Sequence, residues 1–184
     1  DMEIVKLGAG VDENKAFEPI AISRTLKVVE RYSSEIAKRG VQKIRFCATS
    51  ATRDAQNRDE FINGVSQRLG VEPEVISGNE EAALSFLGAT FSLPRKIAPY
   101  LVIDIGGGST EFVFGTEGVE SAKSVNIGCV RMTERHFKND PPTKIEIENA
   151  RIDIKAAIDS AAREVPITKA TSLIASSELA GSIW

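Results

Sequence analysis

The strongest structural signal in the sequence is Leu101-Val102-Ile103-Asp104-Ile105-Gly106-Gly107-Gly108-Ser109-Thr110-Glu111-Phe112-Val113-Phe114-Gly115. An apolar strand ends in an acid, three glycines and two hydroxyl residues follow, and a second acid begins another apolar strand. Glycine adopts a positive φ without strain, so we expect the three glycines to turn the chain tightly and to aim successive N–H groups into one concavity. Such a concavity binds phosphate, and the two carboxylates at its rim offer the oxygen ligands that magnesium prefers. The sequence therefore predicts a phosphate-handling hairpin.

Two better-known phosphate motifs do not fit this run. A P-loop requires G-x-x-x-x-G-K-[ST], and no such string occurs in the sequence. A dinucleotide fingerprint begins a helix, whereas residues 110–114 resemble a strand. The remaining alternative is a β-hairpin turn without a ligand, for which two turn residues would suffice.

Composition favours an ordinary globular protein with one domain or two small ones. The 184 residues are 42% hydrophobic and 27% charged, with a formal net charge of −3, which gives no broad field to attract nucleic acid. No apolar run is long enough to span a membrane, and no signal peptide is visible. Cys47 and Cys129 form no C-x-x-C motif, which favours a reduced, cytoplasmic protein. From the charge and the lack of a membrane span we expect neither a nucleic-acid nor a membrane partner. His136 has no second His or Cys nearby, so we expect a surface residue and no zinc site.

Alternating strand and helix patterns predict an α/β protein with a mixed sheet in each half. The predicted strands cover residues 2–7, 42–48, 72–76, 100–105, 110–115, 120–126 and 171–175, and residues 8–14 form a loop. The predicted helices cover residues 18–39, a segment capped by Asn57, residues 80–89 capped by Asn79, a short segment after Gly128, and residues 143–164 with a capping box. Two prolines in residues 92–99 mark a linker. We therefore place a boundary near Pro99, between domains 1–98 and 99–184, with the hairpin turn at the cleft between them.

Two adjacent acids, Glu80 and Glu81, lie in the first turn of a predicted helix directly after a strand. The positive end of the helix favours their charged form, and a carboxylate there can accept a proton from water or orient it. Complementing the helix dipole alone is the alternative explanation.

Arg53 follows a strand that ends in small hydroxyl residues. Its guanidinium could form charge-assisted hydrogen bonds to a phosphate. An arginine in a solvated turn is the alternative, and the residue by itself favours that alternative.

Together these motifs resemble those of the Ppx/GppA family of exopolyphosphatases and guanosine pentaphosphate phosphohydrolases. The resemblance runs from about Val5 to Phe137 and rests on five motifs in order: residues 7–12 (LGAGVD), 48–55 (ATSATRDA), 76–82 (ISGNEEA), 102–111 (VIDIGGGSTE) and 128–131 (GCVR). It implies the actin-like, sugar kinase-like and Hsp70-like ATPase fold, with two related α/β domains around a cleft.

The resemblance also implies a role for each matching residue. Glu81 aligns with the glutamate that activates the attacking water, and Asp104 and Glu111 with acids associated with Mg²⁺. The second phosphate loop matches Gly106, Gly107, Gly108 and Ser109, and Arg53 matches an arginine that helps to hold the phosphate chain. Glu80, Thr110 and Arg131 are secondary candidates. The implied substrate is inorganic polyphosphate or guanosine pentaphosphate, and homodimers are common in the family.

The sequence departs from the family pattern in two places. A first strand with a D-x-G-[ST]-N-S-type phosphate loop is absent, and a glycine-threonine loop is missing from residues 175–181. Because the chain starts without an initiator Met and stops abruptly, we expect a fragment or a chain from which unobserved segments are left out. Three other functions stay open: a sugar or acetate kinase of the same fold, a regulatory module that binds nucleotide or polyphosphate without catalysis, and an ATPase-type assembly scaffold.

Overall fold

The computed structural model describes residues 2–177, and the chain divides into two compact units. The first unit ends at Ile76 and the second begins at Ser77. We predicted a boundary near Pro99, but helix α5 (Gly78–Thr90) buries Ala82 and Phe86 in the core of the second unit. The division between compact units therefore falls before that helix. The assignment of residues 1–98 and 99–184 to two family domains stays a prediction.

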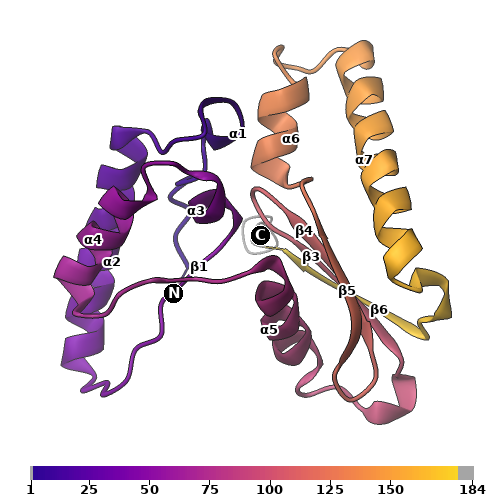
Figure 1. Cartoon of the computed structure of the whole chain (residues 1–184), viewed down its shortest axis with the longest axis horizontal. Coiled ribbons are helices and arrows are strands. Elements are labelled where there is room, and N and C mark those ends of the chain that lie inside the picture. The colour runs from indigo at the N-terminus through magenta and orange to yellow at the C-terminus, as the bar shows by residue number, and fades with distance from the viewer. Residues whose placement is uncertain (1, 178–184) are drawn as a thin grey trace. The chain divides into compact units, whose positions relative to one another are not determined.

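In the first unit, helices α2 and α4 pack side by side (Figure 1). The predicted amphipathic helix over residues 18–39 is confirmed as α2, and its buried Ile22 and Val29 join a core that includes Phe17 and Phe61. The rings of these two phenylalanines meet edge to face with centroids 5.8 Å apart. The elements of this unit are α1 (Val11–Asn14), α2 (Pro19–Lys38), β1 (Cys47–Ala48), α3 (Ser50–Asp54), α4 (Arg58–Leu69) and β2 (Glu74–Val75).

The strand predictions for the first unit are largely wrong. Residues 2–7 form no strand, and the predicted strand over residues 42–48 shortens to β1, which pairs in parallel with β2 alone. Strand formation depends on hydrogen bonds from a neighbouring strand, and none of the described segments pairs with residues 2–7. The sheet of this unit is therefore a parallel pair and not a mixed sheet. Residues 11–14 of the predicted loop form the short helix α1.

Asn57 occupies the predicted N-cap position of α4, but its side chain does not cap the helix. Its Oδ1 accepts a hydrogen bond from the Phe17 N–H at 2.7 Å, and its Nδ2 donates to the Phe17 carbonyl at 3.0 Å. The side chain thus ties two distant segments together.

The second unit is built on a four-stranded mixed sheet of order β5-β4-β3-β6, which confirms the prediction for this half. Strands β3, β4 and β5 form an antiparallel meander, and β6 runs parallel to β3. Its elements are α5, η1 (Arg95–Ile97), β3 (Tyr100–Ile105), β4 (Thr110–Gly115), β5 (Val119–Val125), α6 (Cys129–His136), α7 (Lys144–Glu164), η2 (Ile167–Lys169) and β6 (Ser172–Ser177). The sequence lacks the family's glycine-threonine pair within residues 175–181. Of these, residues 178–181 lie outside the described residues.

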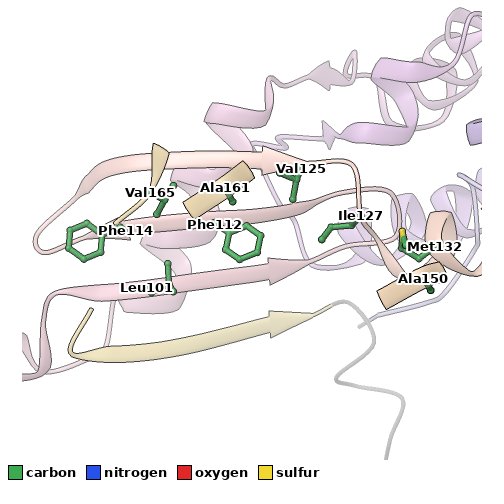
Figure 2. Close-up of a cluster of buried hydrophobic side chains, with 9 residues drawn as sticks. All are labelled: Leu101, Phe112, Phe114, Val125, Ile127, Met132, Ala150, Ala161 and Val165. Atoms are coloured by element: carbon green, nitrogen blue, oxygen red, sulfur yellow. The ribbon is translucent and has the colours of Figure 1, made fainter. Parts of the chain in front are cut away.

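Both faces of this sheet carry apolar side chains, and each face packs against different helices. Side chains alternate along a strand, so Leu101 faces one way and Tyr100 and Val102 face the other. Leu101 packs with residues of β4, β5, α6 and α7, including Phe112 and Met132 (Figure 2). Tyr100 and Val102 pack with Phe86 of α5. Residues that continue the second alternation along β3 therefore lie on the α5 face.

Helix α7 begins with the predicted capping box. The Thr143 hydroxyl accepts a hydrogen bond from the Glu146 N–H at 3.3 Å, and the Glu146 carboxylate accepts from the Thr143 N–H at 2.7 Å. The backbone N–H groups of Thr143 and Lys138 lower the pKa of Glu146 to about 2. These local contacts fix the start of the longest helix on the α6/α7 face.

His136 was predicted at the surface, but its side chain is mostly buried. Its Nε2 lies 3.0 Å from Oδ2 of Asp153 on α7, and Arg135 donates to the same oxygen. The hydrogen bonds from His136 and Arg135 hold the pKa of Asp153 below its usual range.

None of the helices within residues 2–177 is long and apolar enough to cross a membrane.

Candidate functional site

The two acids of the hairpin lie opposite each other. In the antiparallel register Asp104 pairs with Glu111, and Ile105 pairs with Thr110 next to the turn. Because Asp104 is two and four residues beyond Val102 and Tyr100, its side chain lies on the α5 face. Glu111 shares that face because cross-strand partners lie on the same side of the sheet.

Glu111 is a buried acid, with only 1% of its surface exposed. The Ser124 hydroxyl on β5 donates to its Oε1 at 2.7 Å, and the Ser109 side chain also hydrogen-bonds to it. Burial raises the pKa of Glu111, the two serines lower it, and the negative charges of Glu81 and Asp104 raise it further. The charge effects of Glu81 and Asp104, together with the pairing of Asp104 with Glu111, indicate that the three carboxylates lie close enough to interact.

Asp104 is half-buried at the end of β3. The Ser85 hydroxyl of α5 donates to its Oδ2. Helix α5 thus contacts the acid pair directly through a side chain one helical turn after Glu81.

The start of α5 separates the two candidate glutamates. Ser77 is the N-cap, and its hydroxyl accepts from the Glu80 N–H at 3.2 Å, so the predicted cap at Asn79 is wrong. Glu80 is exposed, whereas Glu81 is half-buried and interacts electrostatically with Glu111. Only Glu81 of the two is placed by the described contacts beside the acids of the hairpin.

The glycine turn is real, but its backbone conformation differs from the prediction. The Gly106 N–H donates to the Ser109 carbonyl at 3.0 Å and closes a four-residue turn. None of the three glycines has a positive φ. The turn is instead shaped by its carbonyl groups, which accept hydrogen bonds from the first backbone N–H groups of α6, beginning at Cys129.

The secondary candidates beside the turn are Thr110 and Arg131, and both side chains donate hydrogen bonds to backbone carbonyls. The Thr110 hydroxyl donates to the Ile127 carbonyl, and the buried Arg131 donates from Nε to the Gly108 carbonyl at 2.7 Å. These bonds connect the turn to the segment that leads into α6.

Arg53 lies on α3 of the first unit, where it donates from one guanidinium nitrogen to the Ile76 carbonyl at 2.7 Å. It is half-buried, which argues against a fully solvated turn residue. The structure therefore brings together the predicted residues of the second unit, namely Glu81, Asp104, Gly106, Gly107, Gly108, Ser109 and Glu111. Arg53 belongs to a separately described unit.

Comparison with known proteins decides the family. Residues 1–182 match the model of the Ppx/GppA phosphatase family. The chain belongs to this family. The predicted membership of the Ppx/GppA family is thus confirmed.

Members of the Ppx/GppA family resemble the chain over most of its length. Exopolyphosphatase 2 of Mycobacterium tuberculosis is 42% identical over 172 residues, which cover 91% of this chain and 54% of that protein. A guanosine-5'-triphosphate,3'-diphosphate pyrophosphatase of Vibrio cholerae is 36% identical over 157 residues, which cover 84% of this chain and 31% of that protein. The chain spans about half the length, or less, of these relatives.

Solved structures confirm the predicted fold class. The crystal structure of an exopolyphosphatase-like protein aligns with a TM-score of 0.91 at 47% identity, covering 94% of this chain and 56% of the other. The chain thus has the α/β fold of Ppx/GppA proteins. This is the actin-like fold that the family resemblance implied.

Two residues of this candidate site, Ser85 and Ser124, were not predicted. Ser124 pairs with Glu111 across β4 and β5, and Ser85 follows Glu81 at helical spacing. Both signals are present in the sequence, but each becomes visible only when the strand register and the helix start are known.

The acids fit magnesium in their chemistry without forming a complete protein cage. Among residues 2–177, no group of three His, Cys, Asp or Glu side chains could hold a metal ion. Magnesium, however, is often bound through one or two carboxylates, with water and substrate phosphates supplying the other ligands. Asp104 and Glu111 provide two carboxylates, and their repulsion is unfavourable until a cation or a proton offsets it.

Proposed function

We propose that the protein carrying this chain hydrolyses a terminal phosphoanhydride and releases phosphate from inorganic polyphosphate, guanosine pentaphosphate or both. The observation that carries the proposal is the gathering of Glu81 of α5 with Asp104 and Glu111 of the sheet, next to the glycine turn. Family membership supports it, because curated relatives are named for both activities.

Glu81 is the base that orients and deprotonates the attacking water. It is half-buried and stands in the first turn of α5, at the positive end of the helix dipole. A general base has to lie within hydrogen-bond reach of the proton that it removes, and the position beside the acid pair provides that location for a water. Glu80, which is exposed, does not serve in this role.

The glycine turn holds the terminal phosphate through backbone N–H groups. Within residues 2–177, the N–H groups of Gly107 and Gly108 donate to no acceptor, while their carbonyls are bonded toward α6. Aligned backbone N–H groups form an anion-binding concavity without adding a positive side chain. They stabilise the charge of the transferring group at fixed positions, as phosphoryl transfer requires.

Asp104 and Glu111 are the residues that would hold Mg²⁺, and the ion would neutralise charge on the phosphates when bound. The hydroxyls of Ser85 and Ser124 orient these two carboxylates by donating to them. The Glu111 side chain is buried, so bulk water hardly reaches it. The serines and the burial together keep the acids in place before substrate arrives.

Arg53 is the residue that the family resemblance assigns to holding the phosphate chain. One of its guanidinium nitrogens donates to the Ile76 carbonyl, which fixes the side chain. A guanidinium can form charge-assisted hydrogen bonds to phosphate oxygens. We also propose a cytoplasmic location and keep the homodimer as a prediction.

Two alternatives remain distinguishable by experiment. A sugar or acetate kinase of the same fold would transfer phosphate to an acceptor and leave little free phosphate. A regulatory module would bind polyphosphate or nucleotide without releasing phosphate.

The test is phosphate release by the complete natural protein that carries this chain, with Mg²⁺, on long-chain polyphosphate and guanosine pentaphosphate in parallel. Hydrolysis in ¹⁸O-labelled water is expected to place one labelled oxygen in each released phosphate. Labelled release from either substrate supports the proposal and identifies the preferred substrate. Tight binding of both substrates without labelled phosphate would contradict it and favour the regulatory module.

A further inference from the structure

The carbonyl groups of all three glycines in the turn are bonded to α6. The N–H of Cys129 donates to the Gly106 carbonyl at 3.0 Å, and the N–H groups of Val130 and Arg131 donate to the Gly107 carbonyl at 3.0 and 3.1 Å. The third carbonyl, that of Gly108, accepts from the Arg131 side chain at 2.7 Å. The turn is thus bonded along its length to one helix end and one guanidinium.

This pattern fixes the direction of the N–H groups. In a trans peptide the carbonyl of one residue and the N–H of the next point to opposite sides. Since the carbonyls of Gly106, Gly107 and Gly108 are bonded toward α6, the N–H groups of Gly107, Gly108 and Ser109 are directed away from it. The peptide that carries the Ser109 N–H is the one whose carbonyl is bonded to Arg131.

The same bonds remove α6 as an anion site. Its first N–H groups are occupied by the glycine carbonyls, so they are not available to a phosphate. Arg131 is 7% exposed, and its Nε is committed to Gly108. Gly128 permits this close approach, because a Cβ there would overlap the backbone of Gly107 and Gly108.

We propose that Arg131 is a positioning residue that holds the Gly108–Ser109 peptide so that the Ser109 N–H faces the phosphate. Arg131 acts through the turn and does not contact the substrate. This inference rests on the proposed function, because it assigns the orientation of the same phosphate-binding turn.

Two substitutions separate positioning from direct phosphate binding. Arg131→Gln retains an N–H donor at the same distance along the side chain as Nε but removes the positive charge. Arg131→Lys retains the charge but places a methylene where Nε was. A positioning role predicts a KM for polyphosphate within about threefold of wild type for Arg131→Gln and at least about tenfold higher for Arg131→Lys, with little change in kcat.

Arg135→Gln is the matched control, because Arg135 lies on the same helix and is exposed. It loses the same charge away from the turn, so its KM is expected to equal that of wild type. Thermal midpoints of all variants show whether KM follows stability. A second readout uses Arg131→Ala with added methylguanidinium, which is expected to restore KM by donating to the freed Gly108 carbonyl.

The outcomes separate this inference from the proposed function. If wild type releases no phosphate, the proposed function fails. If wild type is active, a lower KM for Arg131→Gln than for Arg131→Lys supports Arg131 as a positioning residue. If the Lys variant does not fold, rescue of Arg131→Ala by methylguanidinium supports it instead. The inference is overturned if KM is lower for Arg131→Lys than for Arg131→Gln, if the two variants have equal KM values, or if a folded Arg131→Ala is not rescued. Each of these results leaves the hydrolase proposal standing.

Discussion

Replacing Phe86 with alanine tests whether α5 is anchored to the sheet that carries the acids. Phe86 is 1% exposed and packs with Val102 and Val113, and its ring lies 6.3 Å from that of Tyr100 at an angle of 65°. Truncation removes most of a buried ring and leaves a cavity between helix and sheet. Phe→Ala changes in such positions cost about 3–5 kcal/mol.

Phe91→Ala is the matched control at the end of the same helix. Phe91 is 93% exposed, so its loss is expected to change stability by no more than about 0.5 kcal/mol. Urea unfolding of both variants and wild type, followed by circular dichroism, measures the difference. At about 2–4 °C per kcal/mol for a chain of this size, Phe86→Ala should lower the thermal midpoint by roughly 6–20 °C.

The same variant has a functional consequence. Ser85, next to Phe86, donates to Asp104, and Glu81 is one turn earlier. A loosened α5 is therefore expected to lower kcat even at temperatures where the protein stays folded. Equal midpoints for Phe86→Ala and Phe91→Ala would refute the claim that this packing anchors the helix.

Two further predictions concern the α7 cap and the glycine turn. The lowered pKa of Glu146 means that the folded state binds its proton less readily than the unfolded state, so this group's stabilisation is present above pH 4.5 and is lost as pH falls toward about 2. Glu146→Gln should remove that part of the pH dependence in urea unfolding between pH 2 and 5, and an unchanged slope would contradict the capping box. Gly128→Ala places a Cβ against the Gly107 and Gly108 backbone, so it should cost about 1–3 kcal/mol and raise the KM for polyphosphate. A variant with wild-type stability and KM would show that the turn does not need this close approach.

The elements predicted correctly are those whose signals are local. The Thr143 capping box and the apolar strands on both sides of the glycines are encoded within a few residues, so their positions follow from the sequence. The strand predicted at residues 2–7 failed because strands depend on distant partners that local pattern does not reveal. Asn57 failed as a side-chain cap for a similar reason, since its amide is used by Phe17, forty residues away.

The site was predictable in its residue types but not in its construction. The acids and glycines were identified together, and the structure places those of the second unit beside one another. The glycine conformation was mispredicted because the carbonyl bonds to α6, and not a left-handed backbone, shape the turn. Ser85 and Ser124 were missed because their contacts depend on a helix face and a strand register that only tertiary structure fixes.

The most direct test of the central claim compares Glu81→Gln with its neighbour Glu80→Gln in the complete protein. Both changes remove one negative charge from the same helix turn, but only Glu81 is half-buried and interacts with Glu111. Loss of a general base is expected to lower kcat for phosphate release by about 10²–10⁴-fold in Glu81→Gln, with KM nearly unchanged and Glu80→Gln close to wild type. Equal turnover in the two variants would contradict the assignment of Glu81 as the catalytic base.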